Sequence, residues 1–320
     1  MVIYQKSKKC WIIVQCLHGK WVSNGSQESK FCKDNKMKKF TEDLYKKYNQ
    51  NIAIEKIIIK KNSLYQKILI FDSKYFGRVM TLDKVVQITE YDHHGYSEML
   101  THVPILSHGK IKKVLIIGGG DGAIAAEVLK YDEIEEISIC EIDEEVINLS
   151  KLYLNNINHG CLDNPKVNVI IKDASKLINN KNYKNYFDLI IADRPDPIGP
   201  GKNLFKIKFY ENIKNILSEK GIAVFQNGVP FFQEKELKDT NKYLKNTFKL
   251  SGTYLTVVPT YIGGYMALAW ASKKTDMSKN INSNKMIETC KKLNTKYYTK
   301  DIHRSSFILP SWIKKIINSK

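Results

Sequence analysis

The segment from Val114 to Asp143 constrains the fold of this chain more than any other stretch. It reads VLIIGGGDGAIAAEVLKYDEIEEISICEID: an apolar run, a glycine-rich turn, an apolar-periodic stretch and a second apolar run that ends at Glu141. This order predicts a strand, a tight turn, a helix and a second strand. Glycines let a ligand approach the backbone, and a carboxylate at the end of the second strand suits a ribose diol. The segment therefore predicts a nucleoside-binding site.

The glycine spacing leaves the kind of nucleoside open. Gly118, Gly120 and Ala123 fit the dinucleotide fingerprint, whereas Gly118, Gly120 and Gly122 fit the shorter turn used for ligands of the S-adenosylmethionine type. Asp121 helps to separate the two, because its carboxylate would stand where a dinucleotide places its pyrophosphate. A cationic sulfonium or ammonium ligand suits that carboxylate better. A tight turn without any ligand is the third reading of this stretch.

Beyond this segment the chain alternates strands and helices, which predicts a doubly wound sheet. The further elements that we expect are strands at Val167–Ile171, Phe187–Ala192 and Ile222–Gln226 and helices at Glu144–Tyr153, Phe209–Leu217 and Gln233–Asn246. Thr253–Val258 and Tyr265–Ser272 predict an antiparallel pair at one sheet edge. The predicted fold class is α/β, a doubly wound, methyltransferase-like Rossmann domain preceded by a small N-terminal β-rich domain.

The N-terminal part of the chain has a different pattern. From Ile52 to Thr89 it reads as strands, including a run over Ile52–Lys60 and a hairpin around Asp83 and Lys84, and Gly95–Leu106 reads as a connecting helix. Three regions are predicted. They are a disordered leader or start-site extension over 1–36, a β-strand domain with the connecting helix over 37–106, and a Rossmann-like nucleoside-binding catalytic domain over 107–320.

The high positive charge of the chain is best explained by its codon composition. The formal net charge is +18, yet Arg78, Arg194 and Arg304 are the only arginines, and the lysines are spread along the chain among many Asn and Ile residues. A/T-rich codons account for that composition better than a nucleic-acid footprint does. No run approaches the roughly 18 apolar residues of a membrane span. The 6 cysteines lack C-x-x-C spacing, which favours reduced thiols in a cytoplasmic protein. We expect neither nucleic acid nor membrane as a partner.

Polar residues follow the predicted strands of the doubly wound sheet. Ligands of such sheets bind beyond the carboxyl ends of the strands, so these residues are expected to meet on one rim. They are Asp121, Glu141, Asp173, Asp193 and the pair Gln226 and Asn227. Their convergence predicts an acidic site within a basic protein.

The stretch Ile190–Pro200, IIADRPDPIGP, is the most distinctive of these strand ends. Asp193 and Asp196 flank two residues, and two carboxylates on a constrained loop can divide the tasks of proton acceptor and cation ligand. D-x-x-D alone occurs often by chance. D-x-x-D-P-I-G-P at the end of a strand is much more specific.

Together with other motifs, this loop gives the chain a family resemblance. The motifs are LYQKILIF, FGRVMTLDKVVQ, YSEMLTHVPILSHG, VLIIGGGDGA, EID, DPIGPGKNLF, FYENIKNIL, FQNGV, PTYIGG and HRSSFILP. In these motifs and their order, from about Phe40 to Lys315, the chain resembles the polyamine aminopropyltransferases and specifically the bacterial spermidine synthases.

The resemblance implies a role for each matching residue. Asp193 matches the catalytic aspartate, and Asp121 matches the aspartate that holds the aminopropyl amine. The positions that match nucleoside contacts are Gln66, Glu141, Asp173, Ala174 and Pro200. The positions that match the surroundings of the diamine are Tyr96, Ser97, Asp196 and Tyr261, with Ser97 standing where His or Gln is common.

Departures from the family pattern lie near the predicted site. Arg194 and Pro195 stand between the two loop acids, where the family usually has small residues. We expect Arg194 to point out of the cleft, because inside it the guanidinium would compete with a cationic substrate for the acids. His93 and His94 replace a usual Glu-Phe pair, and we expect both on the surface and not as metal ligands. These changes bear on substrate preference more than on reaction class.

The resemblance implies transfer of an aminopropyl group from decarboxylated S-adenosylmethionine to putrescine, giving spermidine and methylthioadenosine. Asp193 would accept the proton of the attacking amine. No metal and no cofactor are expected, because decarboxylated S-adenosylmethionine is a co-substrate, and a homodimer or homotetramer is implied. The alternatives are another amine acceptor such as agmatine or spermidine, an S-adenosylmethionine-dependent methyltransferase, and a non-enzymatic nucleic-acid binder.

Overall fold

The computed structural model describes residues 2–6, 11–17, 20–22, 38–45, 47–194, 199–279 and 283–319. The chain divides into two compact units, Met1–Met37 and Lys38–Lys320. The first unit holds the antiparallel strands β1 (Val2–Lys6), β2 (Trp11–Leu17) and β3 (Lys20–Val22). The leader predicted for residues 1–36, and the domain division at residue 107, stay predictions.

The second unit begins with antiparallel strands. A hairpin of β4 (Lys39–Tyr45) and β5 (Tyr48–Ala53) is followed by the sheet β6-β7-β8-β9, which comprises Lys56–Asn62, Lys67–Ser73, Gly77–Leu82 and Val85–Thr89. The run predicted as strand over Ile52–Lys60 is divided between β5 and β6. Its backbone changes sheets midway, because Ile54 N–H donates to Lys38 O at 2.8 Å and Glu55 N–H donates to Asp72 O at 2.9 Å.

The hairpin predicted around Asp83 and Lys84 is confirmed between β8 and β9. Both turn residues have positive φ, 45° and 65°. Two consecutive positive φ values belong to the type I′ turn, whose twist matches that of the flanking strands. This local geometry fixes the register of the two strands.

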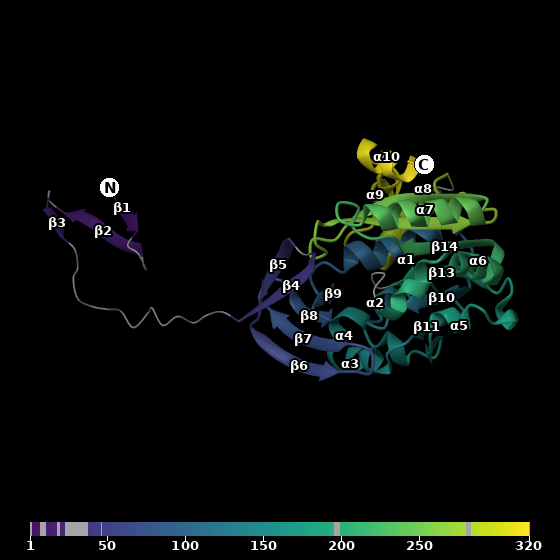
Figure 1. Ribbon diagram of the computed structural model, residues 1–320, viewed down its shortest axis with the longest axis horizontal. Helices are drawn as coiled ribbons and strands as arrows, with labels where there is room; N and C mark the ends of the chain where they lie inside the picture. Colours follow the sequence, from purple (N-terminus) through teal and green to yellow (C-terminus); the bar gives the residue numbers. More distant parts are fainter. Residues whose placement is uncertain are drawn as a thin grey trace. The chain divides into compact units, whose positions relative to one another are not determined.

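The remainder forms a seven-stranded sheet in the order β12-β11-β10-β13-β14-β16-β15. Figure 1 shows β14, β13, β10 and β11 side by side. The parallel strands are β10 (Lys113–Gly118), β11 (Glu136–Glu141), β12 (Val167–Ile171), β13 (Phe187–Asp193) and β14 (Leu217–Gln226). The antiparallel pair β15 (Leu250–Val257) and β16 (Tyr265–Ser272) lies at one edge, as predicted.

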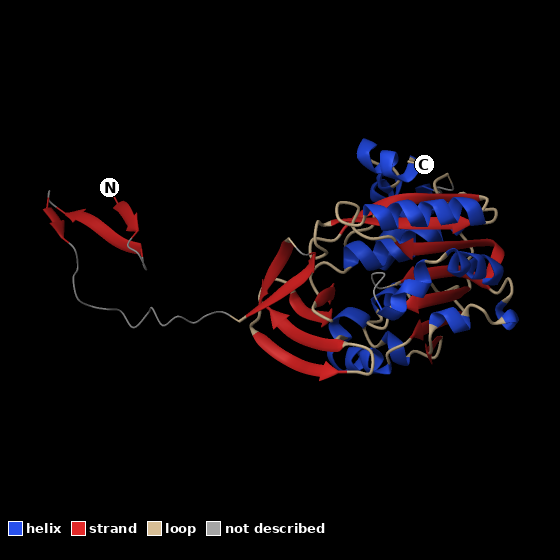
Figure 2. Cartoon of the chain, in the orientation of Figure 1, coloured by secondary structure: helices blue, strands red, loops and turns tan. Residues whose placement is uncertain are grey.

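Helices pack on both faces of this sheet (Figure 2). Successive side chains of β10 alternate between the faces, so that Val114 and Ile116 belong to one apolar cluster and Leu115 and Ile117 to the other. The helices are α1 (His94–His108), α2 (Ala123–Val128), α3 (Glu144–Tyr153), α4 (Asn155–Asn158), α5 (Ala174–Leu177), α6 (Ile207–Ile216), α7 (Glu234–Thr247), α8 (Ser283–Leu293), α9 (Lys300–Ser306) and α10 (Ser311–Asn318). The predicted α/β fold class is confirmed.

The lengths of the helices can be compared with the length that a membrane span requires. Among the described residues, no helix is both long and apolar enough to cross a membrane. The longest, α1, has 15 residues and carries Pro104 within it.

Candidate active site

The glycine turn after β10 brings two of the predicted acids together. Gly118 pairs with Asp193 across β10 and β13, and a Cβ built on Gly118 would stand 2.0 Å from the Asp193 carbonyl oxygen. Gly118 and Gly119 have φ of 79° and 67°, which glycine adopts readily and other residues rarely do. The turn therefore needs glycine both for its conformation and for the close approach of the two strand ends.

Asp121 follows this turn and lies at the start of α2. Its Oδ1 accepts the N–H of Ala123 at 2.7 Å, and its carbonyl oxygen accepts Nδ2 of Asn158 at 3.0 Å. Burial raises the pKa of Asp121 above its usual value, and the hydrogen bond from Ala123 opposes that rise. The contacts fix the carboxylate beside the cavity described below.

Asp193, at the end of β13, is paired with a tyrosine. The hydroxyl of Tyr96 donates to Oδ1 of Asp193 at 2.5 Å. Burial raises the pKa of Asp193 to about 7, the charge of Asp121 adds to the rise, and the Tyr96 hydrogen bond works against it. Asp193 can therefore exchange a proton near neutral pH, as a general base must.

Tyr261 completes this wall of the site. Its ring meets Tyr96 edge to face, with centroids 5.5 Å apart and planes at 80°. Its hydroxyl donates to Gln87 O at 2.7 Å. The two rings form an apolar wall next to the carboxylates, and their hydroxyls are already held by the protein.

A cavity of about 110 Å³ lies between these side chains. Of the residues predicted from the sequence, the cavity brings together Tyr96, Ser97, Asp121, Asp193 and Tyr261. Ser97 contributes little polarity, because its hydroxyl donates to the carbonyl of His93 within α1 at 3.0 Å. The cavity thus combines carboxylates and tyrosine rings with an otherwise largely aliphatic lining.

The residues predicted to contact the nucleoside lie at the ends of the adjoining strands. Oε1 of Glu141 accepts the N–H groups of Ile142 at 2.7 Å and Asp143 at 3.0 Å, and burial raises the Glu141 pKa to about 7. A Cβ on Gly120 would stand 3.0 Å from Oε2 of Glu141. Glu141 therefore reaches back to the glycine turn, as a ribose ligand should.

Gln66 is held in this region by a residue that sequence reasoning missed. Nε2 of Gln66 and Oγ of Ser63 donate to Oδ2 of Asp143 at 2.9 and 2.6 Å, while Oδ1 of Asp143 accepts the N–H of Glu145 at 3.1 Å. Asp143 thus caps α3 and fastens the β6-β7 turn to the Rossmann-like sheet. Its position two residues after Glu141, just before a helix, was the available signal.

Asp173 also caps a helix. Its Oδ1 accepts the N–H of Ser175 at 2.8 Å at the start of α5, and Ala174 beside it is buried. Asp196 lies outside the described residues. Pro200 falls within η3 (Gly199–Phe205), a short 3₁₀ segment, and the structure does not describe its side chain.

Glu42 is a further carboxylate of the cavity that the sequence did not reveal. It lies on β4, is 2% exposed and lines the cavity. Gln50 of β5 donates to Glu42 and, at 2.5 Å, to the carbonyl of Thr260. The signal was its register: Glu42 and Phe40 share the buried side of β4, and a carboxylate on an inward face is uncommon without a partner or a ligand.

Polar atoms at the end of β14 have no partner among the described side chains and backbone. They are Oε1 of Gln226 and both polar side-chain atoms of Asn227, which are buried. Gln226 lines the cavity. An unsatisfied buried acceptor facing a cavity fits a ligand that brings N–H donors.

The surface position predicted for His93 is wrong, whereas His94 is half-buried. His93 is 7% exposed and lines the cavity, and its ring centroid lies 3.8 Å from that of His94. The start of α1 packs closely on β15, since a Cβ on Gly95 would stand 2.3 Å from Val257 O. Burial lowers the His93 pKa to about 3, so its imidazole is neutral at physiological pH.

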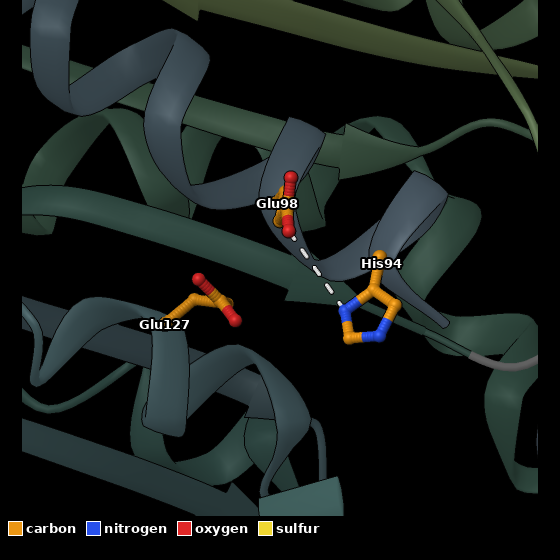
Figure 3. A group of neighbouring side chains, drawn as sticks. All are labelled: His94, Glu98 and Glu127. Atoms are coloured by element: carbon orange, nitrogen blue, oxygen red, sulfur yellow. Dashed lines mark ion pairs between the residues drawn. The ribbon is translucent and has the colours of Figure 1, made fainter. Parts of the chain in front are cut away.

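His94, Glu98 and Glu127 form a second cluster, with potential ligand atoms all within 4.8 Å of one another. Figure 3 shows Glu127 reaching from a separate helix toward the other two. However, Glu98 accepts three backbone N–H groups of residues 296–298 at 2.7 to 2.9 Å, and Glu127 lies 2.7 Å from Nζ of Lys130. Because these donors occupy the carboxylates, the cluster is a structural contact that holds α1 against its neighbours.

Arg194 is among the residues that line the cavity, but its guanidinium is directed into the protein interior. Its side chain is 2% exposed. The guanidinium donates to Leu204 O at 2.5 Å, Tyr210 Oη at 2.8 Å, Gln226 O at 3.2 Å and Thr240 Oγ1 at 3.2 Å. The expectation that Arg194 points out of the cleft did not include this buried position, in which the protein interior supplies the acceptors that hold the guanidinium.

Comparison with known proteins identifies the family of this chain. Residues 93–299 match the family model described as the spermine/spermidine synthase domain, and residues 40–90 match that of the spermidine synthase tetramerisation domain. The polyamine aminopropyltransferase of Ruegeria sp. (strain TM1040) is 42% identical over 277 residues, covering 86% of this chain and 97% of the relative. That of Buchnera aphidicola subsp. Acyrthosiphon pisum (strain Tuc7) is 45% identical, covering 88% and 98%.

Solved structures give the same result. A crystal structure of spermidine synthase in complex with the transition state analogue AdoDATO has a TM-score of 0.83 and 33% identity, covering 88% of this chain and 96% of that one. Spermidine synthase from Thermotoga maritima has a TM-score of 0.81 and 33% identity, covering 88% and 95%. Sequence motifs, fold and acidic site thus agree, and the chain belongs to the spermine/spermidine synthase family and is an aminopropyltransferase.

Proposed function

We propose that this enzyme transfers the aminopropyl group of decarboxylated S-adenosylmethionine to putrescine, giving spermidine and methylthioadenosine. The observation that supports this proposal most directly is the hydrogen bond between Tyr96 and Asp193, close to Asp121. Asp193 lies at the end of β13, which pairs with β10, the first strand of the predicted nucleoside-binding segment. A nitrogen of putrescine attacks the carbon next to the sulfonium. The C–S bond breaks, its electron pair stays on sulfur, and the proton of the attacking nitrogen goes to Asp193.

Asp193 accepts this proton only when it is ionised. Its pKa of about 7 in the empty site leaves it partly protonated at neutral pH. Substrate cations favour the ionised form, because opposite charge nearby lowers the pKa of a carboxyl. Binding of the cationic substrates therefore prepares the base. No cofactor is required, since a sulfonium is already an activated leaving group.

Asp121 supports the choice of the decarboxylated nucleoside. In S-adenosylmethionine a substrate carboxylate would face Asp121, and two carboxylates about 4–5 Å apart repel by about 3–4 kcal/mol at an effective dielectric near 20. The decarboxylated form carries only the amine there and is attracted. This repulsion also disfavours the methyltransferase alternative, whose co-substrate keeps that carboxylate.

The acceptor end of the cavity supports a dicationic amine. Glu42 is a buried carboxylate on that lining, and Oε1 of Gln226 is an unpartnered acceptor. Both suit ammonium N–H donors. We assign Glu42 and Asp196 to the distal ammonium of putrescine, and Gln66, Glu141, Asp173, Ala174 and Pro200 to the nucleoside.

One incubation tests the reaction and its acceptor. The enzyme is mixed with decarboxylated S-adenosylmethionine and either putrescine, agmatine or spermidine, and products are identified by mass spectrometry. We expect spermidine and methylthioadenosine in equal amounts with putrescine, and at most a small fraction of that rate with the other amines. Faster reaction with agmatine or spermidine would reassign the acceptor. Methyl transfer from S-adenosylmethionine in a parallel arm would overturn the proposal.

We also propose an oligomeric state and a cellular compartment for this enzyme. The match of residues 40–90 to a tetramerisation domain supports a homodimer or homotetramer, which light scattering of the purified protein tests directly. Cys140 and Cys161 are free and buried, and reduced thiols of this kind are typical of the cytoplasm, where we place the enzyme.

A further inference from the structure

Arg194 is a buried cation directly after the proposed catalytic base. Along an extended backbone, successive side chains point to opposite sides. Asp193 accordingly meets Tyr96, while Arg194 turns into the interior formed by β14, α6 and α7. In this position the guanidinium holds groups that belong to the surroundings of the site.

The neighbours of Arg194 supply hydrogen-bond acceptors for its donor groups. Among the described residues, no carboxylate lies within ion-pair distance of its guanidinium. Instead it donates to carbonyl and hydroxyl oxygens and stacks on Phe205, with 3.8 Å between Cζ and the ring centroid. Burying a charge without its hydrogen bonds is costly, so these contacts must form together. Lysine lacks the fork that reaches several acceptors at once.

One of these contacts reaches a residue that lines the cavity, and a second reaches η3. Nε donates to Gln226 O, at the end of β14, at 3.2 Å. One terminal nitrogen donates to Leu204 O, in η3, at 2.5 Å. The other contacts, with Tyr210 and Thr240, lie on α6 and α7. The guanidinium thus ties the end of β14 and η3 to the backbone that carries Asp193.

We propose that Arg194 is a positioning residue that fixes Gln226 and η3 relative to Asp193, and thereby sets the affinity for the acceptor amine. Oε1 of Gln226 is buried on the cavity lining without a partner, so its distance from Asp193 determines how well an ammonium fits between them. Asp193 itself is held separately by Tyr96. Loss of Arg194 should therefore weaken amine binding more than the chemical step. The inference rests on the proposed function.

Arg194→Met tests this, since it keeps an apolar stem of similar length and removes the donors. We expect KM for the amine to rise about tenfold, as for a lost hydrogen bond to a charged donor, with kcat and the affinity for methylthioadenosine changed less than threefold. Arg194→Lys should restore part of the affinity. An amine KM within twofold of wild type in Arg194→Met would overturn the proposal.

Thr240→Val is the matched control. It removes the α7 hydroxyl that accepts from Arg194 and leaves the contacts to Gln226 and Leu204 intact. We expect Thr240→Val to lower the melting temperature while leaving the amine KM within twofold of wild type. If it raises KM as much as Arg194→Met does, general loosening explains the effect and the positioning role is wrong.

Hydrogen–deuterium exchange makes the test independent of activity. In Arg194→Met, peptides covering 199–206 and 226–230 should exchange at least about fivefold faster, whereas the peptide of β10 should not change. Equal acceleration in all three peptides, or none in the first two, would overturn the inference. Failure of wild type to make spermidine would instead overturn the proposed function and leave this measurement valid.

Discussion

Tyr96 and Asp193 are joined by a 2.5 Å hydrogen bond between residues 97 positions apart in the chain, one from α1 and one from β13. The bond places a phenol against the carboxylate that we assign as the base. The hydroxyl donates to the ionised carboxylate and therefore favours its ionisation, while burial and Asp121 act in the opposite direction. The pKa of Asp193 therefore depends on the balance between the Tyr96 hydrogen bond, which lowers it, and burial and Asp121, which raise it.

Asp193→Asn should reduce kcat by roughly 10²–10⁴, because a missing general base typically costs that much. Binding of methylthioadenosine, measured by calorimetry, should change little, since the residues that we assign to the nucleoside are unaltered. Raising the pH should restore part of the rate by deprotonating the amine in solution. A variant that keeps its rate but loses nucleoside affinity would show that Asp193 is a binding residue.

Asp121→Asn and Tyr96→Phe should shift the pH dependence of kcat/KM in opposite directions. The wild-type profile should fall below about pH 7, where Asp193 becomes protonated in the free enzyme. Removing the Asp121 charge lowers the Asp193 pKa and moves this limb to lower pH. Removing the Tyr96 hydroxyl raises the pKa and moves it to higher pH. Shifts of the same sign in both variants would contradict the assignment of the limb to Asp193.

Gly118→Ala should destabilise the protein by at least about 2 kcal/mol, because a Cβ at φ 79° would also stand 2.0 Å from Asp193 O. Gly109→Ala is the control: its φ is 82°, but its Cβ would meet nothing within 4 Å. Gly109→Ala should lose about 1 kcal/mol of stability, which is the cost of a left-handed conformation for a residue with a Cβ. Urea unfolding of both variants separates the two effects, and equal losses would argue against the close approach of β10 and β13.

His303→Gln should make the protein less sensitive to acid. Burial lowers the His303 pKa to about 4 from its ordinary 6.5. Between these two values the imidazole is protonated in the unfolded chain and neutral in the folded protein. The stability of the wild type is therefore complete above pH 6.5 and falls as the pH drops toward 4. Between pH 7 and 4.5 the wild type should lose on the order of 2 kcal/mol more than His303→Gln. Parallel pH dependences in urea unfolding would contradict this.

The alternating α/β order, the edge pair β15-β16 and the β8-β9 turn could be predicted from the sequence, because each depends on local periodicity or on a few consecutive residues. The acids at the strand ends could be predicted for the same reason. Parallel strands place their carboxyl ends on one rim, so knowing where β10 and β13 end was sufficient to bring Asp121 and Asp193 together. The motifs in their order also gave the family.

Contacts between elements that are distant in the chain could not be predicted from the sequence and became apparent in the folded structure. Glu42 reaches the cavity from β4, and Asp143 holds Gln66 across 77 positions. The environments of His93 and Arg194 likewise depend on neighbours that no local pattern specifies. We expected Arg194 to point out of the cleft because its guanidinium would compete there with a cationic substrate. The folded chain instead offers carbonyl oxygens, hydroxyls and an aromatic ring that satisfy a buried guanidinium, and such a set of acceptors exists only once β13, β14, α6 and α7 have packed together.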